Sequence, residues 1–225
     1  MTLALTAVRQ DDTTVAVLTR LLARLHLLDI RVKRRYLDRG FFSVPVIRWL
    51  LALDVPFEMP VILRGKHGGT RQLLTGGRSC QTWYTMKSQE YGTVRVQVVI
   101  VWGYRNGKAG KHGREYFVYA IHRVALRGHA LFQDYRRRFG IETSYRLKNT
   151  CRIKTTTKNP VVRLLFVGIA FLLIDLWVYL LWTVVSLPRQ GGRLIYREDF
   201  PLKTLFEFLR QAIDRHHRVR RAVVI

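Results

Sequence analysis

The sequence predicts an α/β protein in which a sheet-forming region is followed by helices. Three observations support this fold class: residues 2–63 alternate between strand and helix patterns, residues 64–128 are rich in Val, Tyr, Trp and Ile between Gly-rich turns, and residues 129–225 have helical patterns. Alternating strands and helices produce a sheet with helices on its faces. The chain has 225 residues and 48% apolar content, which is enough for one sizeable core.

The first part of the chain is expected to contain three strands and two helices. Apolar residues recur at helical spacing from Val15 to Leu28, and Asp11 or Asp12 can cap this helix. Pro45 suits the first turn of a second helix. Short apolar or alternating runs predict strands at residues 2–8, 30–37 and 57–63.

The rest of the chain is expected to change from strands to helices. The middle part predicts strands at residues 82–87, 93–104 and 115–124, the last two joined by a hairpin. The last part predicts helices at residues 130–149, 160–187 and 201–217. The expected organisation is a partial α/β core over residues 1–63, a β-rich insertion over 64–128, and a helical remainder with a basic tail over 129–225.

The charge of the chain predicts a polyanionic partner. There are 39 Lys and Arg against 15 Asp and Glu, a formal net charge of +24. Binding of so many cations to DNA or to an anionic membrane surface is favoured because it releases bound counterions. A basic surface without such a partner is the remaining interpretation.

The cysteines and histidines do not form a metal-binding motif. Cys80 and Cys151 have no second Cys or His at ligand spacing, and His216 and His217 are the only adjacent pair of histidines. We interpret both cysteines as reduced thiols of a cytoplasmic protein. The N-terminal residues lack the basic region of a signal peptide.

An apolar run at residues 164–187 allows two interpretations. Its length satisfies the rule of about 20 residues for spanning a bilayer, which makes a membrane protein with one helix an alternative. Its only charged residue is Asp175, near the middle, where a carboxylate costs about 2.5 to 3.5 kcal/mol in a bilayer. A helix buried in a protein core gives the same pattern, and we expect this second form.

Asp38 is a candidate catalytic residue because it follows a predicted strand. A carboxylate at the C-terminal end of a strand in an α/β sheet is well placed to face a ligand. The sequence Asp38-Arg39-Gly40 is also a common way to start a turn, and spacing alone leaves both interpretations open.

Glu142 is the second candidate, within a predicted basic helix. Tyr135, Arg138 and Glu142 are three and four residues apart and so share one helical face, which Arg146 continues. Glu142 could form surface ion pairs, worth less than about 1 kcal/mol each. It could instead hold a divalent metal while its basic neighbours, Lys148 among them, bind phosphates.

Three segments resemble a known family. The string YRRRFGIETSYRLKN, residues 135–149, resembles the Tyr-x2-Arg-x3-Glu-x6-Lys signature of DDE-type insertion-sequence transposases. LDRGFFS, residues 37–43, is similar to the motif around the second catalytic Asp of that family. KNPVVRLLFVGIAFLLIDLWVYLLW, residues 158–182, is similar to the apolar helix that follows the signature. The position of the final signature Lys is Asn149 here, with Lys148 one residue earlier.

The resemblance implies a ribonuclease H-like fold that is incomplete at its N-terminus. In that fold the first catalytic Asp lies on the first strand, the second follows the fourth strand, and the Glu lies on a late helix. Residues 2–8, 30–37 and 57–63 would be the third, fourth and fifth strands, and residues 64–128 the β-rich insertion of this group. The strand with the first Asp would be missing, and Asp11 and Asp12 follow the third strand and cannot replace it.

The resemblance also implies a chemistry and a set of partners. Three carboxylates of the family hold two Mg²⁺ or Mn²⁺ ions for DNA strand cleavage and strand transfer, with Asp38 and Glu142 as two of the ligands here. Tyr135 and Arg138 would position the DNA end, and Arg146 and Lys148 would bind DNA. The expected partners are terminal inverted repeats and a second copy of the chain, in a homodimer. Without the first Asp the chain is expected to be inactive alone, and a non-catalytic DNA-binding remnant is a further alternative.

Overall fold

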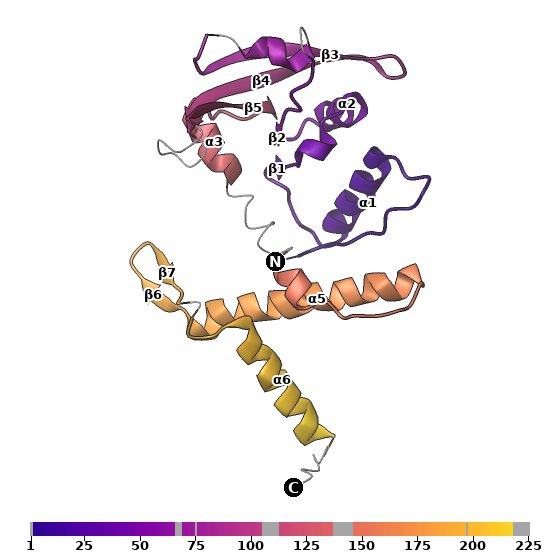
Figure 1. Ribbon diagram of the computed structural model, residues 1–225, viewed down its shortest axis with the longest axis vertical. Coiled ribbons are helices and arrows are strands. Elements are labelled where there is room, and N and C mark those ends of the chain that lie inside the picture. Colours follow the sequence, from indigo (N-terminus) through magenta and orange to yellow (C-terminus); the bar gives the residue numbers. More distant parts are fainter. Residues whose placement is uncertain are drawn as a thin grey trace. The chain divides into compact units, whose positions relative to one another are not determined.

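The computed structural model describes residues 2–65, 69–74, 76–104, 113–136, 146–196 and 198–217 (Figure 1). The chain divides into two compact units. We call residues 6–140 the sheet unit, and residues 1–5 with 141–225 the helical unit.

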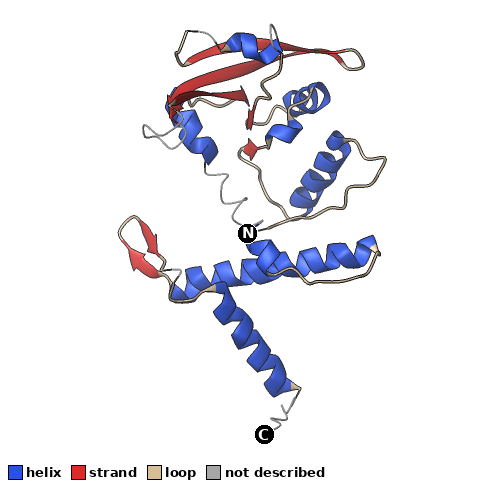
Figure 2. Ribbon diagram, in the orientation of Figure 1, coloured by secondary structure: helices blue, strands red, loops and turns tan. Residues whose placement is uncertain are grey.

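The sheet unit contains a five-stranded mixed sheet, in the order β1-β2-β5-β4-β3. Its strands are labelled in Figure 1 and drawn in red in Figure 2. β1 and β2 are parallel, and the other neighbouring strands are antiparallel. The chain is thus of mixed α/β class, as predicted. The strands are β1 (Arg35–Tyr36), β2 (Phe57–Pro60), β3 (Cys80–Ser88), β4 (Gly92–Tyr104) and β5 (Arg114–His122).

Side chains alternate between two apolar faces of this sheet. On β4, Val96, Val98 and Ile100 belong to one buried cluster and Val99 and Val101 to the other, as the period of two along a strand requires. Helix α2 (Val44–Ala52) packs on the first face and α3 (Gly128–Arg136) on the second. The predicted strands at 82–87, 93–104 and 115–124 are confirmed, and they continue the sheet because β5 pairs with β2.

Two predicted strands at the start of the chain are wrong or too long. Residues 2–8 form no strand, and the predicted strand at 30–37 is reduced to β1. Backbone groups of the first segment bind side chains instead: the N–H of Thr2 donates to Asp175, within the helical unit, and the carbonyl of Ala7 accepts from Arg20, within the sheet unit. An apolar run alone could not reveal these partners, because they lie far away in the sequence.

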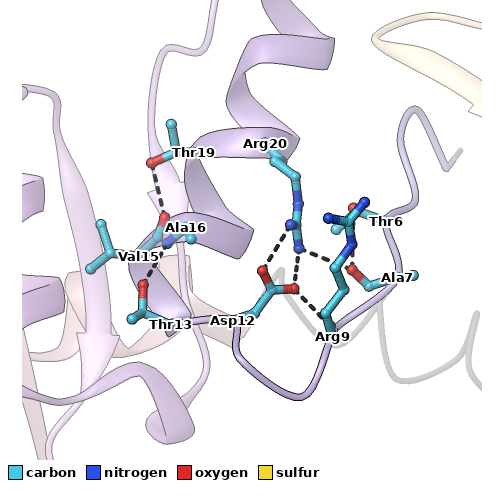
Figure 3. Close-up of polar contacts among 9 residues, drawn as sticks. All are labelled: Thr6, Ala7, Arg9, Asp12, Thr13, Val15, Ala16, Thr19 and Arg20. Carbon is cyan, nitrogen blue, oxygen red and sulfur yellow. Dashed lines mark hydrogen bonds and ion pairs between the residues drawn. The ribbon is translucent and has the colours of Figure 1, made fainter.

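Helix α1 (Thr14–Leu27) forms where the periodicity predicts it, but its cap differs. The hydroxyl of Thr13 accepts the N–H of Ala16 at 3.1 Å, so Thr13 is the N-cap and neither Asp11 nor Asp12 is (Figure 3). Val15 and Leu18 pack against the α2 face of the sheet. Helix α2 has Pro45 in its first turn, as predicted.

The helical unit is built around α5 (Pro160–Leu180). Asn159 caps this helix, and a π-helical turn (Leu181–Val185) extends it towards the short hairpin of β6 (Leu187–Arg189) and β7 (Gly192–Leu194). The predicted helix at 160–187 is thus two residues too long, and that at 201–217 is confirmed as α6 (Leu202–His216). The indole N–H of Trp177 donates to the carbonyl of Phe200 at 2.8 Å. This bond holds the residues just before α6 against α5.

Asp12 forms an ion pair across the start of α1. It accepts from Arg20 and from the backbone N–H of Arg9, the latter at 2.7 Å (Figure 3). The hydrogen bond from Arg20, followed by that from Arg9, lowers the pKa of Asp12 to about 2. The carboxylate therefore contributes stability above its ordinary pKa, and this contribution is lost as the pH falls through about 2.

We expect Asp12→Asn to lower the melting temperature at pH 7 and to lose this effect towards pH 2. The measurement is thermal unfolding of both proteins between pH 7 and pH 2. Asp11→Asn is the matched control because it removes the neighbouring carboxylate and leaves the contact between Asp12 and Arg20 in place. Equal effects of the two variants would show that the ion pair has no specific role.

Candidate functional site

Asp38 lies directly after strand β1. The N–H of Leu37 donates to the carbonyl of Glu58 at 3.1 Å, so pairing with β2 continues to the residue before Asp38. An oxygen of Asp38 accepts the N–H of Arg39 at 2.7 Å and caps a 3₁₀ helix (Arg39–Phe41), and the side chain is exposed. Both interpretations of this residue hold together: Asp38 begins a turn, and it also presents a carboxylate at the C-terminal end of a parallel strand.

Tyr135 ties the last turn of α3 to this strand. Its hydroxyl donates to the carbonyl of Leu37 at 2.9 Å, in a buried contact between residues 98 positions apart. Its ring also packs against Tyr36 and Tyr119, with centroids 6.4 and 5.1 Å apart. The first residue of the signature segment thus contacts the residue before Asp38.

Asp134 makes a second connection between α3 and β1. Its carboxylate accepts the hydroxyl of Tyr36 at 2.7 Å and pairs with Arg34. Two consecutive helix residues thus contact β1 and the residues on either side of it: Asp134 contacts Arg34 and Tyr36, and Tyr135 contacts Leu37. We call the contacts of Asp134 and Tyr135 with Arg34, Tyr36 and Leu37 the α3–β1 clamp.

The clamp lies on the face of the sheet that Asp38 shares. Leu37 belongs to the cluster under α2, and Tyr36 to the cluster under α3. The backbone is still extended at Asp38, and side chains of an extended segment alternate between faces. Asp38 therefore lies on the α3 face.

Glu58 is a second carboxyl group on this face, and it is buried. It pairs in register with Tyr36, has an exposure of 0%, and neither of its carboxyl oxygens has a hydrogen-bond partner. Burial, and then the negative charge of Asp134, raise the pKa of Glu58 to about 8, although Arg34 acts in the opposite direction. Glu58 is therefore mostly protonated at neutral pH.

Four residues of this region were not predicted as site residues from the sequence: Glu58, Asp134, Arg34 and Tyr36. Glu58 lies between apolar residues in a strand of four and has no motif around it. One signal was present for Asp134: it is the only acidic residue between Glu115 and Glu142, immediately before Tyr135 in a strongly basic segment.

Of the other predicted site residues, Arg138 and Glu142 lie outside the described residues. Arg146 and Lys148 belong to the helical unit, in a helical segment at residues 146–150, with Arg146 exposed and Lys148 half-buried. Tyr135 is buried, so contact of its hydroxyl with DNA would require loss of the hydrogen bond to Leu37.

Among the described residues, Asp38 is the predicted metal ligand whose position can be stated. Asp38 offers an exposed hard oxygen ligand of the kind that Mg²⁺ and Mn²⁺ prefer. Over the described ranges no group of three or more His, Cys, Asp and Glu is arranged to hold a metal ion. Asp38 is therefore a candidate ligand, and the described residues provide no complete ligand set around it.

Comparison of the sequence with protein-family models and with curated proteins gives no match. The function of the chain is therefore inferred from its own residues.

We expect Glu58→Gln to stabilise the protein increasingly as the pH rises from 5 to 9. The folded protein retains a proton on Glu58 up to a pH of about 8 whereas the unfolded chain loses it near 4.5, so unfolding becomes easier over this range. The neutral amide removes this dependence, which is worth about 3 to 5 kcal/mol at high pH. The measurement is denaturant unfolding at several pH values.

Glu90→Gln is the control, because Glu90 is exposed in the turn between β3 and β4. A stability difference between Glu58→Gln and the wild type that stays constant from pH 5 to pH 9 would show that Glu58 ionises normally in the folded protein.

Proposed function

We propose that this chain forms part of the catalytic domain of a DDE-type DNA transposase with a ribonuclease H-like fold. One observation carries the proposal: the hydrogen bond from Tyr135 to the carbonyl of Leu37. It joins the segment that resembles the family's Glu signature to the segment that resembles the motif of its second Asp. The two segments that carry the resemblance therefore lie next to each other in the fold.

The position of Asp38 in the sheet also supports the proposal. The resemblance implies that this carboxylate follows the fourth strand of the fold, with the fifth strand beside it. Here Asp38 follows β1, and β1 pairs in parallel with β2, the next strand along the chain. The parallel pair brings both carboxyl ends to one edge of the sheet, which is where α/β sheets bind ligands.

The proposed roles of the residues follow from their chemistry. Asp38 and Glu142 are metal ligands, and Arg138, Arg146 and Lys148 bind DNA phosphates. Tyr135 holds α3, which precedes Glu142 in the sequence, to β1. Two bound Mg²⁺ or Mn²⁺ ions would activate the attacking water or 3′-hydroxyl and stabilise the leaving oxygen. The third family ligand, the first Asp, has no counterpart among the motifs of this sequence.

DNA is the proposed partner because of the charge of the chain. A net charge of +24 favours a polyanion, and terminal inverted repeats are the DNA that such enzymes act on. We propose a cytoplasmic location and action as a homodimer on paired ends. The binding of DNA without cleavage is the expected behaviour of this chain when the first Asp is absent.

A membrane protein is the second candidate function, and exposure along α5 favours it. One helical stretch, Pro160–Val185, is long and apolar enough to cross a bilayer. Several large apolar side chains along it are exposed, so the expectation of a helix buried all round is wrong for this unit. Asp175 accepts two hydrogen bonds from the N–H of Thr2, at 2.9 and 2.8 Å, which partly offsets the cost of a carboxylate in an apolar helix.

Sequencing about a gene's length of DNA on each side of the reading frame tests the proposed function. We expect terminal inverted repeats, and upstream a segment that encodes a strand ending in an Asp. Finding neither would contradict the transposase proposal and favour the membrane protein, for which carbonate-resistant membrane pelleting is the corresponding measurement.

A further inference from the structure

The helical unit contains a basic cavity between the segment after residue 146 and the start of α5. Its volume is about 420 Å³, within the range of small-ligand sites. Three cations line it, Lys148, Arg152 and Arg163, together with the hydroxyl-bearing Thr155. No carboxylate is among the described residues that line the cavity.

The guanidinium of Arg163, which lines this cavity, is held by a hydrogen bond. Its Nε–H donates to the carbonyl of Thr157 at 2.8 Å, which leaves the terminal nitrogens of the guanidinium for another acceptor. A planar guanidinium with a fixed Nε is suited to a phosphate, because its N–H groups match the spacing of phosphate oxygens.

Residues 155–161 form a fixed loop that supports this geometry. Thr155, Thr157 and Asn159 each accept, through a side-chain oxygen, the backbone N–H two residues further on, at 3.1, 3.2 and 2.9 Å. The loop leads directly into α5, where Pro160 occupies the first turn. The cavity is therefore preorganised on the side of Arg163, so less ordering entropy is lost when a ligand binds.

The face of α5 that carries Arg163 also lines the cavity with apolar side chains. Phe166, Val167 and Ala170 follow Arg163 by three, four and seven residues and so lie on one face of α5. Ile153 contributes from the preceding segment. A ligand that matches this lining combines an anionic group with an apolar part.

We propose that this cavity binds one unpaired nucleotide of single-stranded DNA, with its phosphate at Arg152 and Arg163 and its base against Phe166. The inference rests on the proposed function for the choice of DNA as the polymer. A base can stack on an aromatic ring only when it has left the duplex, whereas a duplex offers its phosphates on a convex surface. Unpaired DNA therefore fits both the cations and the apolar side chains that line the cavity.

The test is the binding of a fluorescent oligothymidylate and of a duplex of equal length by the full chain, at several salt concentrations. We expect Arg163→Gln to reduce the dependence of log affinity on log salt by about one for the single strand. We expect Phe166→Leu to weaken single-strand binding about tenfold and to leave duplex binding unchanged, because stacking is lost and charge is kept.

Arg189→Gln is the matched control, since Arg189 is an exposed cation on β6 of the same unit. Circular dichroism of each variant checks that it is folded. Of the three substituted residues, Phe166 is the most buried, and its replacement by Leu keeps an apolar side chain there. Equal effects of Arg163→Gln and Arg189→Gln would overturn the proposal, because binding would then depend on charge alone.

Two further outcomes would also overturn the proposal. A loss of duplex binding by Phe166→Leu as large as that of single-strand binding would assign the cavity to phosphate without a base. Full displacement of the oligonucleotide by millimolar inorganic phosphate would assign it to the free anion. Failure of the wild-type chain to bind any DNA would remove the proposed function as well, whereas DNA binding with unaltered pocket variants would remove only the cavity's role.

Discussion

The contact between the last turn of α3 and strand β1 is the constraint on which the candidate site depends. β1 is a strand of two residues at the edge of the sheet, and alone it would hold Asp38 weakly. Tyr135 binds the backbone of Leu37, and Asp134 binds Tyr36 and Arg34. The position of Asp38 is thereby fixed from two sides, by β2 within the sheet and by α3 above it.

The same region contains an electrostatic arrangement that costs stability. Asp134 and the buried Glu58 are close enough for the negative charge of one to raise the pKa of the other, and Arg34 compensates only in part. A buried carboxyl group without hydrogen bonds is unfavourable, and strongly perturbed pKa values are often found at functional sites. The position of Glu58, one strand from Asp38 and on the same face, agrees with this tendency.

Local signals in the sequence were sufficient for most helices and for the long strands. Pro45 marks the start of α2, the alternating valines mark β4, and Asn159-Pro160 marks the start of α5. Residues whose structure depends on distant partners were not predictable in this way. The first residues of the chain were expected to form a strand because they are apolar, but they form none. Strand β1 is short because its partner β2 ends at Pro60, which has no backbone N–H to continue the pairing.

The residues of the candidate site also fall into two groups, those marked by local motifs and those defined by distant contacts. Asp38 and Tyr135 stood out by their motifs, and the exposed strand-end position of Asp38 followed from its place after a predicted strand. Asp134 and Glu58 did not stand out, because burial and pairing are tertiary properties that one strand or one helical turn does not encode. Clusters of cations could be recognised in the sequence. The cavity could not, because it forms where the segment that contains Lys148 and Arg152 lies beside the start of α5, which contains Arg163.

The most direct measurement is a double-mutant cycle on Mn²⁺ affinity, with Asp38→Asn, Glu142→Gln and the combined variant, read by electron paramagnetic resonance of the full chain. Glu198→Gln serves as a control for general loss of negative charge. If Asp38 and Glu142 hold the same ion, each single variant weakens binding and the double variant loses less than the sum, with a coupling above about 0.5 kcal/mol. Additive effects of the two single substitutions would contradict a shared metal centre. So would an Mn²⁺ affinity of the Asp38 or Glu142 variant equal to that of the Glu198→Gln control.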